Sequence, residues 1–99
     1  MATPANPLAE AFARHRQGEF DLAERGYRAV LKAQPGNPDA LYLLGMLCLD
    51  RAHPDEAARH LGLAIKALGR ARRKVDPAWR LALGTALQRA GKPVPALAA

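Results

Sequence analysis

The chain repeats itself at a spacing of 34 residues, and this internal repeat limits the folds that it can adopt. At this shift, small, apolar and turn residues align in the pairs Ala11/Gly45, Gly18/Ala52, Ala23/Ala57, Tyr27/Leu61, Val30/Ala64, Leu31/Ile65 and Pro35/Gly69. A further shift of 39 aligns Pro38/Pro77, Leu44/Leu83, Gly45/Gly84, Cys48/Leu87, Ala52/Gly91 and Ala57/Ala96. The five extra residues fall in the stretch 69–74. Repeats of this length stack one unit on the next, because no single unit covers its own apolar face.

Helix-start signals recur along the chain. Asn6, Asn37 and Asp76 each precede a proline, and such residues cap the free N–H groups of a first helical turn while proline fits its first position. Shorter breaks follow near residues 17–19, 52–54 and 90–93, which places successive helices antiparallel. These signals predict helices near 7–17, 19–34, 38–52, 54–69, 77–90 and 93–98.

Composition agrees with an all-helical domain. Of the 99 residues, 49% are hydrophobic, chiefly Ala and Leu, while aromatic residues make up 5%. The longest apolar run, residues 40–49, is shorter than the roughly 20 residues that span a bilayer, so no membrane partner is expected. The N-terminus lacks the features of a secretion signal, which predicts a cytoplasmic protein. The lone cysteine, Cys48, is expected to be a small buried side chain.

The repeated residues carry a resemblance to a known family. Leu-Gly pairs at 44–45 and 83–84, turn glycines, small residues early in the second helices and a closing proline resemble the tetratricopeptide repeat; they include Gly18, Gly91, Ala23, Ala57, Ala96, Val30, Ala64 and Pro35. The resemblance implies an all-α fold of antiparallel helix-turn-helix repeats, stacked as a short right-handed superhelical solenoid. Gly45 and Gly84 suggest close helix contacts, since glycine costs a helix about 1 kcal/mol.

The repeat pattern divides the chain into units. We expect a disordered segment 1–6, then repeat 1 over about 4–37, repeat 2 over about 38–69, an exposed basic connection 69–75 and a partial repeat 76–99. In the first unit, Glu10 and Arg14 replace apolar positions of the family, so its first helix is expected to be shifted or to form a polar cap. The short third unit predicts weak self-association through the apolar residues of helix 77–90.

The family resemblance implies a binding function without catalysis, in a groove lined by the first helix of each unit. Carried over by position, the groove residues are Leu8, Ala9, Phe12, His15, Arg16, Asp39, Tyr42, Leu43, Met46, Leu49, Asp50, Leu81, Ala82, Thr85, Gln88 and Arg89. The Lys/Asn clamp with which some members hold a C-terminal carboxylate is replaced by Leu8, Phe12, Tyr42 and Met46. We therefore expect a protein or peptide partner that offers an amphipathic helix or apolar segment. Some of these side chains could instead simply pack on a neighbouring helix.

Charge is spread unevenly, which leaves two other functions open. Residues 1–69 carry eight basic and eight acidic side chains, whereas residues 70–99 carry seven basic and one acidic. Arg70, Arg72, Arg73 and Lys74 form a basic patch that is either a solvated surface or a site for nucleic acid or an anionic surface. Nucleic acid is disfavoured because no aromatic residue is interleaved with this run. The chain could also be the leading segment of a larger enzyme, such as a glycosyltransferase or sulfotransferase.

Few residues suit chemistry. The chain has no Ser, and no metal-binding motif or phosphate-binding loop is present, so neither catalysis nor a cofactor is expected. Glu56 and His60 lie four residues apart, which predicts a contact on the helix surface.

Overall fold

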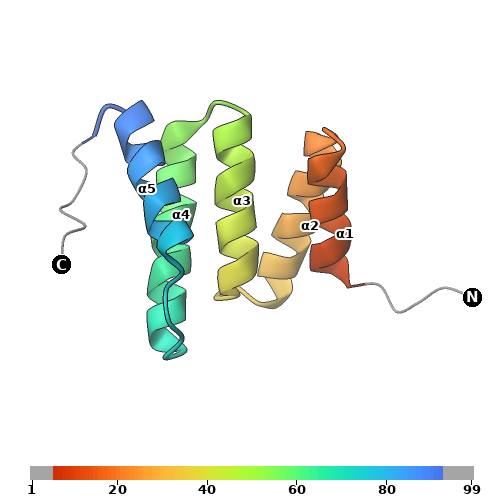
Figure 1. Cartoon of the computed structure of the whole chain (residues 1–99). Coiled ribbons are helices and arrows are strands. Elements are labelled where there is room, and N and C mark those ends of the chain that lie inside the picture. The colour runs from red at the N-terminus through yellow and green to blue at the C-terminus, as the bar shows by residue number, and fades with distance from the viewer. Residues whose placement is uncertain (1–5, 93–99) are drawn as a thin grey trace, which may run out of the picture.

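A computed structural model describes residues 6–92, which form five helices (Figure 1). These are α1 (Pro7–Arg16), α2 (Phe20–Ala33), α3 (Pro38–Asp50), α4 (Pro54–Arg70) and α5 (Pro77–Arg89). The all-α prediction is confirmed, and these helices begin and end within two residues of the expected bounds. The sixth expected helix, 93–98, and residues 1–5 of the expected disordered segment lie outside the described residues.

Three helices begin as the capping residues predicted. The Oδ1 atom of Asn6 accepts hydrogen bonds from the amides of Leu8 and Ala9, at 3.1 and 3.2 Å. In the same way, the Oδ1 atom of Asn37 accepts from Ala40 at 3.0 Å. For α5, Asp76 accepts from the amide of Ala78 at 2.8 Å. Each cap satisfies amide groups that the helix itself leaves without a partner.

Four helices end in a left-handed residue. Gly18, Ala52, Arg72 and Gly91 have φ angles of 80°, 62°, 56° and 72°. In each case the next amide bonds back to a carbonyl five residues earlier, as from His53 to Cys48 at 2.8 Å. The left-handed conformation is free of strain for glycine but costs about 1–2 kcal/mol for other residues. The turn after α1 and the turn after α3 therefore share one geometry although only the first contains glycine.

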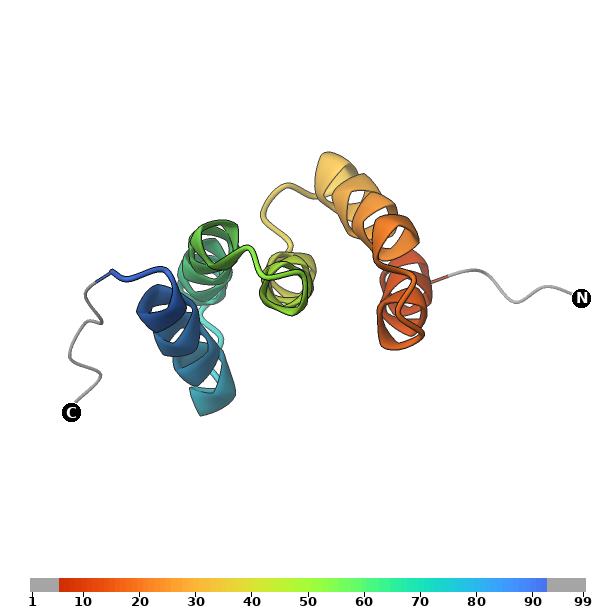
Figure 2. The ribbon, with the colours of Figure 1, turned by 90° about the horizontal axis from the view of Figure 1, so that it is seen from above.

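The helices pack in chain order, each on the next. Seen from above, α2 and α4 lie along one side of the row and α1 and α5 along the other, with α3 between them (Figure 2). Each of the three core clusters includes side chains from α3: Cys48 in one, Leu44 and Leu47 in the second, and Leu41 in the third. The first helix is polar by comparison and buries only Ala11 and His15. This arrangement is an all-α helical repeat solenoid.

Among the glycines whose surroundings the structure describes, Gly45 and Gly26 make close helix contacts. A Cβ atom at Gly45 would lie 2.7 Å from Cγ of Leu61 and 3.3 Å from the carbonyl oxygen of Ala57. The close approach expected at Gly45 is therefore present. In the first pair the roles are exchanged: a Cβ at Gly26, on the second helix, would lie 2.6 Å from Cβ of Ala11. The repeat pattern did not predict the close contact at Gly26, because the Leu-Gly pairs that indicated such contacts lie on the first helices.

The basic connection is shorter than expected. Gly69 and Arg70 belong to the last turn of α4, so the prediction of a loop from residue 69 was wrong by two residues. The connection runs over residues 71–76, and all but Val75 are exposed. Helix α4 extends because the amides of residues 71, 72 and 73 bond back to carbonyls in its last turns.

Candidate functional site

The side of the molecule formed by α1, α3 and α5 is hollowed in two places. The first hollow, of about 510 Å³, lies between α1 and α3 and is lined by Phe12, His15, Arg16, Gly18, Phe20, Tyr42, Leu43, Met46 and Asp50. The second, of about 370 Å³, lies between α3 and α5 and is lined by Tyr42, Met46, Leu49, Asp50, Ala78, Leu81, Ala82, Thr85 and Arg89. Tyr42, Met46 and Asp50 line both, so α3 joins the two hollows. We call these residues together the concave groove.

Most of the positions predicted for a groove lie together in these hollows. They are Phe12, His15, Arg16, Tyr42, Leu43, Met46, Leu49, Asp50, Leu81, Ala82, Thr85 and Arg89. Leu8 instead lines a separate hollow of about 460 Å³ between the start of α1 and the end of α2. Asp39 lies outside the groove lining, with its Oδ2 atom 3.9 Å from Nη1 of Arg73. Ala9 and Gln88 are exposed outside both hollows.

A buried histidine joins the two helix pairs beneath the first hollow. Nε2 of His15 lies 2.6 Å from Oδ2 of Asp50, and Nδ1 lies 3.0 Å from the hydroxyl of Tyr27. A carboxylate only accepts hydrogen bonds, so Nε2 donates to Asp50. Burial, followed by the charge of Asp50, raises the pKa of Tyr27 to about 12, so its hydroxyl remains protonated and can donate to Nδ1 of His15. No sequence pattern predicts this contact, because it joins residues 35 positions apart.

Aromatic stacking holds the other wall of the groove. The rings of Tyr42 and Trp79 lie parallel, with centroids 4.4 Å apart, and join α3 to α5. Burial, followed by the charge of Asp76, raises the pKa of Tyr42. At the first hollow, the guanidinium of Arg16 lies 5.8 Å from the ring centroid of Phe12. Phe20 was missed by the sequence comparison because it lies on a second helix, yet it lines the groove against His15.

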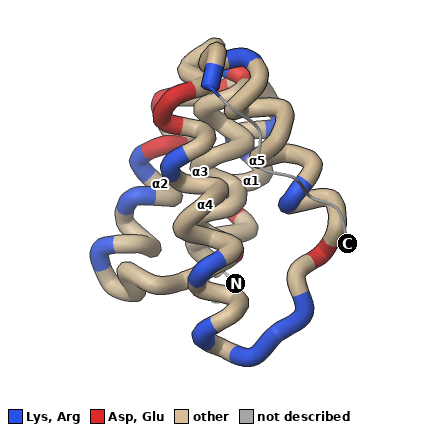
Figure 3. Tube along the Cα trace, turned by 90° about the vertical axis from the view of Figure 1, so that its left-hand side faces the viewer, with Lys and Arg blue, Asp and Glu red and all other residues tan. Residues whose placement is uncertain are grey.

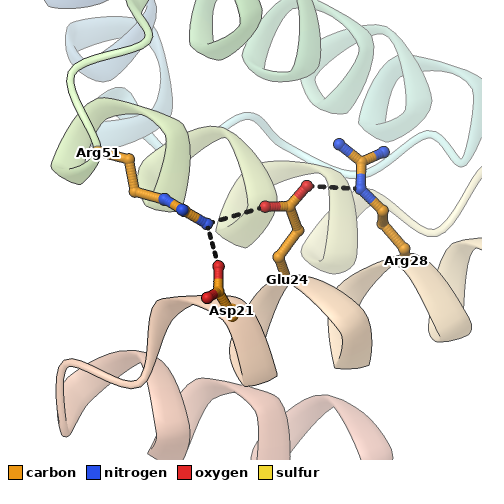
Figure 4. A network of polar contacts seen from close by, with 4 residues as sticks. All are labelled: Asp21, Glu24, Arg28 and Arg51. Carbon is orange, nitrogen blue, oxygen red and sulfur yellow. Dashed lines mark hydrogen bonds and ion pairs between the residues drawn. The ribbon is translucent and has the colours of Figure 1, made fainter.

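A separate ion-pair network joins α2 to the end of α3 (Figure 4). Nη1 of Arg51 lies 3.1 Å from a carboxylate oxygen of Asp21 and 3.1 Å from one of Glu24. The other carboxylate oxygen of Glu24 accepts from Nε of Arg28 at 2.8 Å. Networks of this kind fix the orientation of neighbouring elements more than they stabilise the fold, because exposed pairs contribute about 0–1 kcal/mol. The network therefore links the first helix pair to the second without contributing much to stability.

The histidine of α4 differs from its prediction. The expected surface contact between Glu56 and His60 was wrong: His60 is buried, and neither ring nitrogen has a hydrogen-bond partner among residues 6–92. Burial, followed by the charges of Arg59 and Arg28, lowers the pKa of His60. Cys48 is buried as expected, and burial raises the pKa of its thiol to about 11. A thiol that stays protonated at neutral pH is a poor nucleophile.

The groove is lined mainly by apolar side chains. Within residues 6–92, no three His, Cys, Asp or Glu side chains gather closely enough to hold a metal ion. No helix in the same range is both long and apolar enough to span a membrane. The groove's most exposed apolar side chain is Leu81, at 69%, whereas Leu83 and Leu87 are partly buried against the core.

Comparisons with known proteins agree with this repeat architecture. A family model described as Tetratricopeptide repeat matches residues 14–74. The chain is similar to the cellulose synthase operon protein C of Pseudomonas fluorescens (strain SBW25), at 41% identity over 56 residues. That match covers 57% of this chain and 4% of the length of the relative. No solved structure matches the chain significantly. Because the family model covers more than half of a chain whose helices stack as repeats, the chain belongs to the tetratricopeptide repeat family.

Proposed function

We propose that this chain is a protein-interaction module that binds an apolar or amphipathic segment of a partner in the concave groove. Tetratricopeptide repeats generally serve as protein-interaction modules. The observation that carries the proposal is the continuity of the two hollows across Tyr42 and Met46. A groove of this length accepts a segment lying along α3, with contacts to α1 on one side and α5 on the other.

The chemistry of the lining supports an apolar segment. Phe12 and Leu81 are 39% and 69% exposed, one on each side of α3, and burying them on binding removes apolar surface from water. Met46 lies between them and adapts in shape to different side chains. Among the residues that line the hollows, the charged side chains of Arg16, Asp50 and Arg89 lie at the end where α1, α3 and α5 finish. A partner is expected to present apolar side chains along α3 and a polar group at that end.

Peptide selection tests this proposal directly. A library of random peptides is displayed and selected on the folded chain, and the affinity of the enriched peptides is measured by fluorescence anisotropy. Leu81→Asp or Phe12→Asp is expected to weaken binding at least about tenfold, because an unpaired carboxylate would be buried against an apolar ligand. Leu63→Asp is the matched control, since Leu63 is 42% exposed on α4 and lies outside the groove. An equal loss of affinity in Leu63→Asp, or unchanged affinity in Leu81→Asp, would mean that the peptide binds outside the concave groove.

We also propose weak self-association through the groove side of α5. The supporting observation is Leu81, which exposes more of its side chain than the other large exposed apolar residues described. Arg80 and Arg89 on the same helix oppose association by repulsion, so salt is expected to strengthen it. Sedimentation over a range of concentrations, at low and high salt, measures this. A strict monomer at every concentration and salt would contradict it.

A further inference from the structure

The positive charges of the chain differ in whether an acid lies beside them. Among residues 6–92, ion pairs within 3.2 Å join Arg14 to Glu19, Arg28 to Glu24, Arg51 to Asp21 and Glu24, and Lys92 to Asp55. Within the same described part of the chain, Arg70, Arg72 and Lys74 make no ion pair, and all three are exposed. Arg73 reaches only Asp39, at 3.9 Å. We call Arg70, Arg72, Arg73 and Lys74 the basic edge.

The basic edge places four positive charges within five positions of the chain, and among these four only Arg73 makes an ion pair within the described residues, at 3.9 Å. Figure 3 shows Lys and Arg positions following one another along the loop at the lower edge, with several Asp and Glu positions near the opposite end. The loop is also where the second repeat shift exceeds the first by five residues. Arg72, Arg73 and Lys74 lie in this added connection, whereas Arg70 ends α4.

The basic edge adjoins one end of the concave groove. Asp39, beside Arg73, lies in the first turn of α3, and Tyr42 of the groove follows one turn later. On the other side, Asp76 ends the connection and Trp79 stacks on Tyr42. A segment that lies along α3 and leaves the groove at this end passes next to the basic edge.

We propose that the basic edge binds an acidic stretch of the same partner segment that occupies the concave groove. The proposal rests on the proposed function and adds the partner's charge and its direction. Guanidinium groups pair with carboxylates through two parallel hydrogen bonds, which suits a run of Asp and Glu residues. Nucleic acid is the less favoured polyanion because Trp79, the aromatic side chain nearest along the chain, is already stacked on Tyr42.

The peptide selection described above tests this proposal with a second readout. Peptides enriched on the wild-type chain are expected to carry a run of acidic residues on one side of an apolar core. The variant R72Q/R73Q/K74Q is expected to enrich similar apolar cores without the acidic run. For a peptide selected on the wild type, the triple variant is expected to bind about tenfold more weakly at low salt, and the difference is expected to shrink at high salt.

The controls separate this proposal from its alternatives. R25Q/K32Q/R59Q removes the same charge from exposed positions of α2 and α4 that make no ion pair within the described residues, and it is expected to leave peptide affinity within about twofold of wild type. An equal loss in this control, absence of the acidic run, or unchanged affinity in R72Q/R73Q/K74Q would overturn the proposal. In that case, weaker peptide binding by Leu81→Asp would still support the proposed binding function of the concave groove. Duplex DNA that binds more tightly than the acidic peptide at the same salt would also overturn it. If no peptide is enriched at all, the proposed function fails first.

Discussion

The two complete helix pairs, α1–α2 and α3–α4, share one repeat pattern but solve the same packing problem differently. In the second pair the glycine is on the first helix, where Gly45 faces the side chain of Leu61. In the first pair it is on the second helix, where Gly26 faces Ala11. Helices approach closely only where one presents a small residue, and either helix can supply it. The repeat thus sets where a pair makes contact but not which helix supplies the glycine.

The pairs also differ in how each treats a buried histidine. His15 has a hydrogen-bond partner at each ring nitrogen, and one of these partners lies on the next repeat. His60 is also buried, and its ring nitrogens have no partner in the part of the chain that the structure describes. Buried polar groups stabilise and orient a fold when satisfied, and cost free energy when not. The first histidine therefore acts as a connection between repeats, and the second is a weak point of the core.

The largest effect is expected where the glycines are filled. Leucine at Gly45 or Gly26 overpacks the contact and should lower the free energy of unfolding by about 3 kcal/mol, measured by chemical denaturation. Alanine substitutions should distinguish the two pairs. The new Cβ of Gly26→Ala meets Cβ of Ala11, which cannot move without the backbone, whereas that of Gly45→Ala meets the Leu61 side chain, which can rotate. Gly26→Ala should therefore lose more unfolding free energy than Gly45→Ala. The exposed Arg59→Leu is the control and should be near neutral. A neutral Gly26→Leu would contradict the close contact in the first pair.

Replacing each histidine by leucine compares the two polar sites directly. His15→Leu leaves the buried hydroxyl of Tyr27 without its partner and should cost about 2 kcal/mol of unfolding free energy. His60→Leu removes two unsatisfied nitrogens from a buried position and should be neutral or stabilising at pH 7. Thermal and denaturant melts at pH 7 measure both. Equal losses of unfolding free energy would mean that the hydrogen bonds of His15 do not contribute to stability and that both histidines only fill space in the core.

The pH dependence of stability should follow His60. Its pKa is lower in the folded chain than the usual unfolded value of about 6.5, so below that pH the unfolded state binds more protons. Stability from this group is therefore complete above about pH 6.5 and falls as pH drops, by at most about 1.4 kcal/mol per pH unit. The charged neighbours are Arg59, Arg28, Glu56 and Glu24. The free energy of unfolding is measured from pH 7.5 to 5 for the wild type and for His60→Leu, and the difference between the two isolates the contribution of His60. If both proteins lose the same stability over this range, the prediction is wrong.

The smallest effect concerns the turns that end α1 and α3. Ala52 holds a φ of 62°, whereas its counterpart in the first pair is glycine. Ala52→Gly should raise the free energy of unfolding by about 0.5–1 kcal/mol, because relief of the left-handed conformation exceeds the added entropy of the unfolded chain. Ala71→Gly is the control, since Ala71 has a φ of −81° and gains nothing from glycine. A loss of stability in both variants would contradict this reading of the turn.

The candidate site was predictable where position on a helix decides exposure. Most of the groove residues follow from the repeat alone, because equivalent positions on α1, α3 and α5 face the same side. Leu8 and Asp39 lie outside the groove lining because they are at helix starts, where the neighbouring connection changes what each side chain meets. Phe20 was missed because its contribution comes from a second helix.

The sequence by itself determined the helices, their caps and the repeat, because these depend on residues a few positions apart. Asn6, Asn37 and Asp76 cap their own first turns, and Gly45 marks a close contact from propensity alone. Only the tertiary structure decided that Gly26 faces Ala11, that Asp50 reaches His15, and that Arg51 joins Asp21 and Glu24. Helical periodicity fixes the direction in which a side chain points. Which group it meets depends on how far neighbouring helices shift and tilt, and many distant contacts set that together.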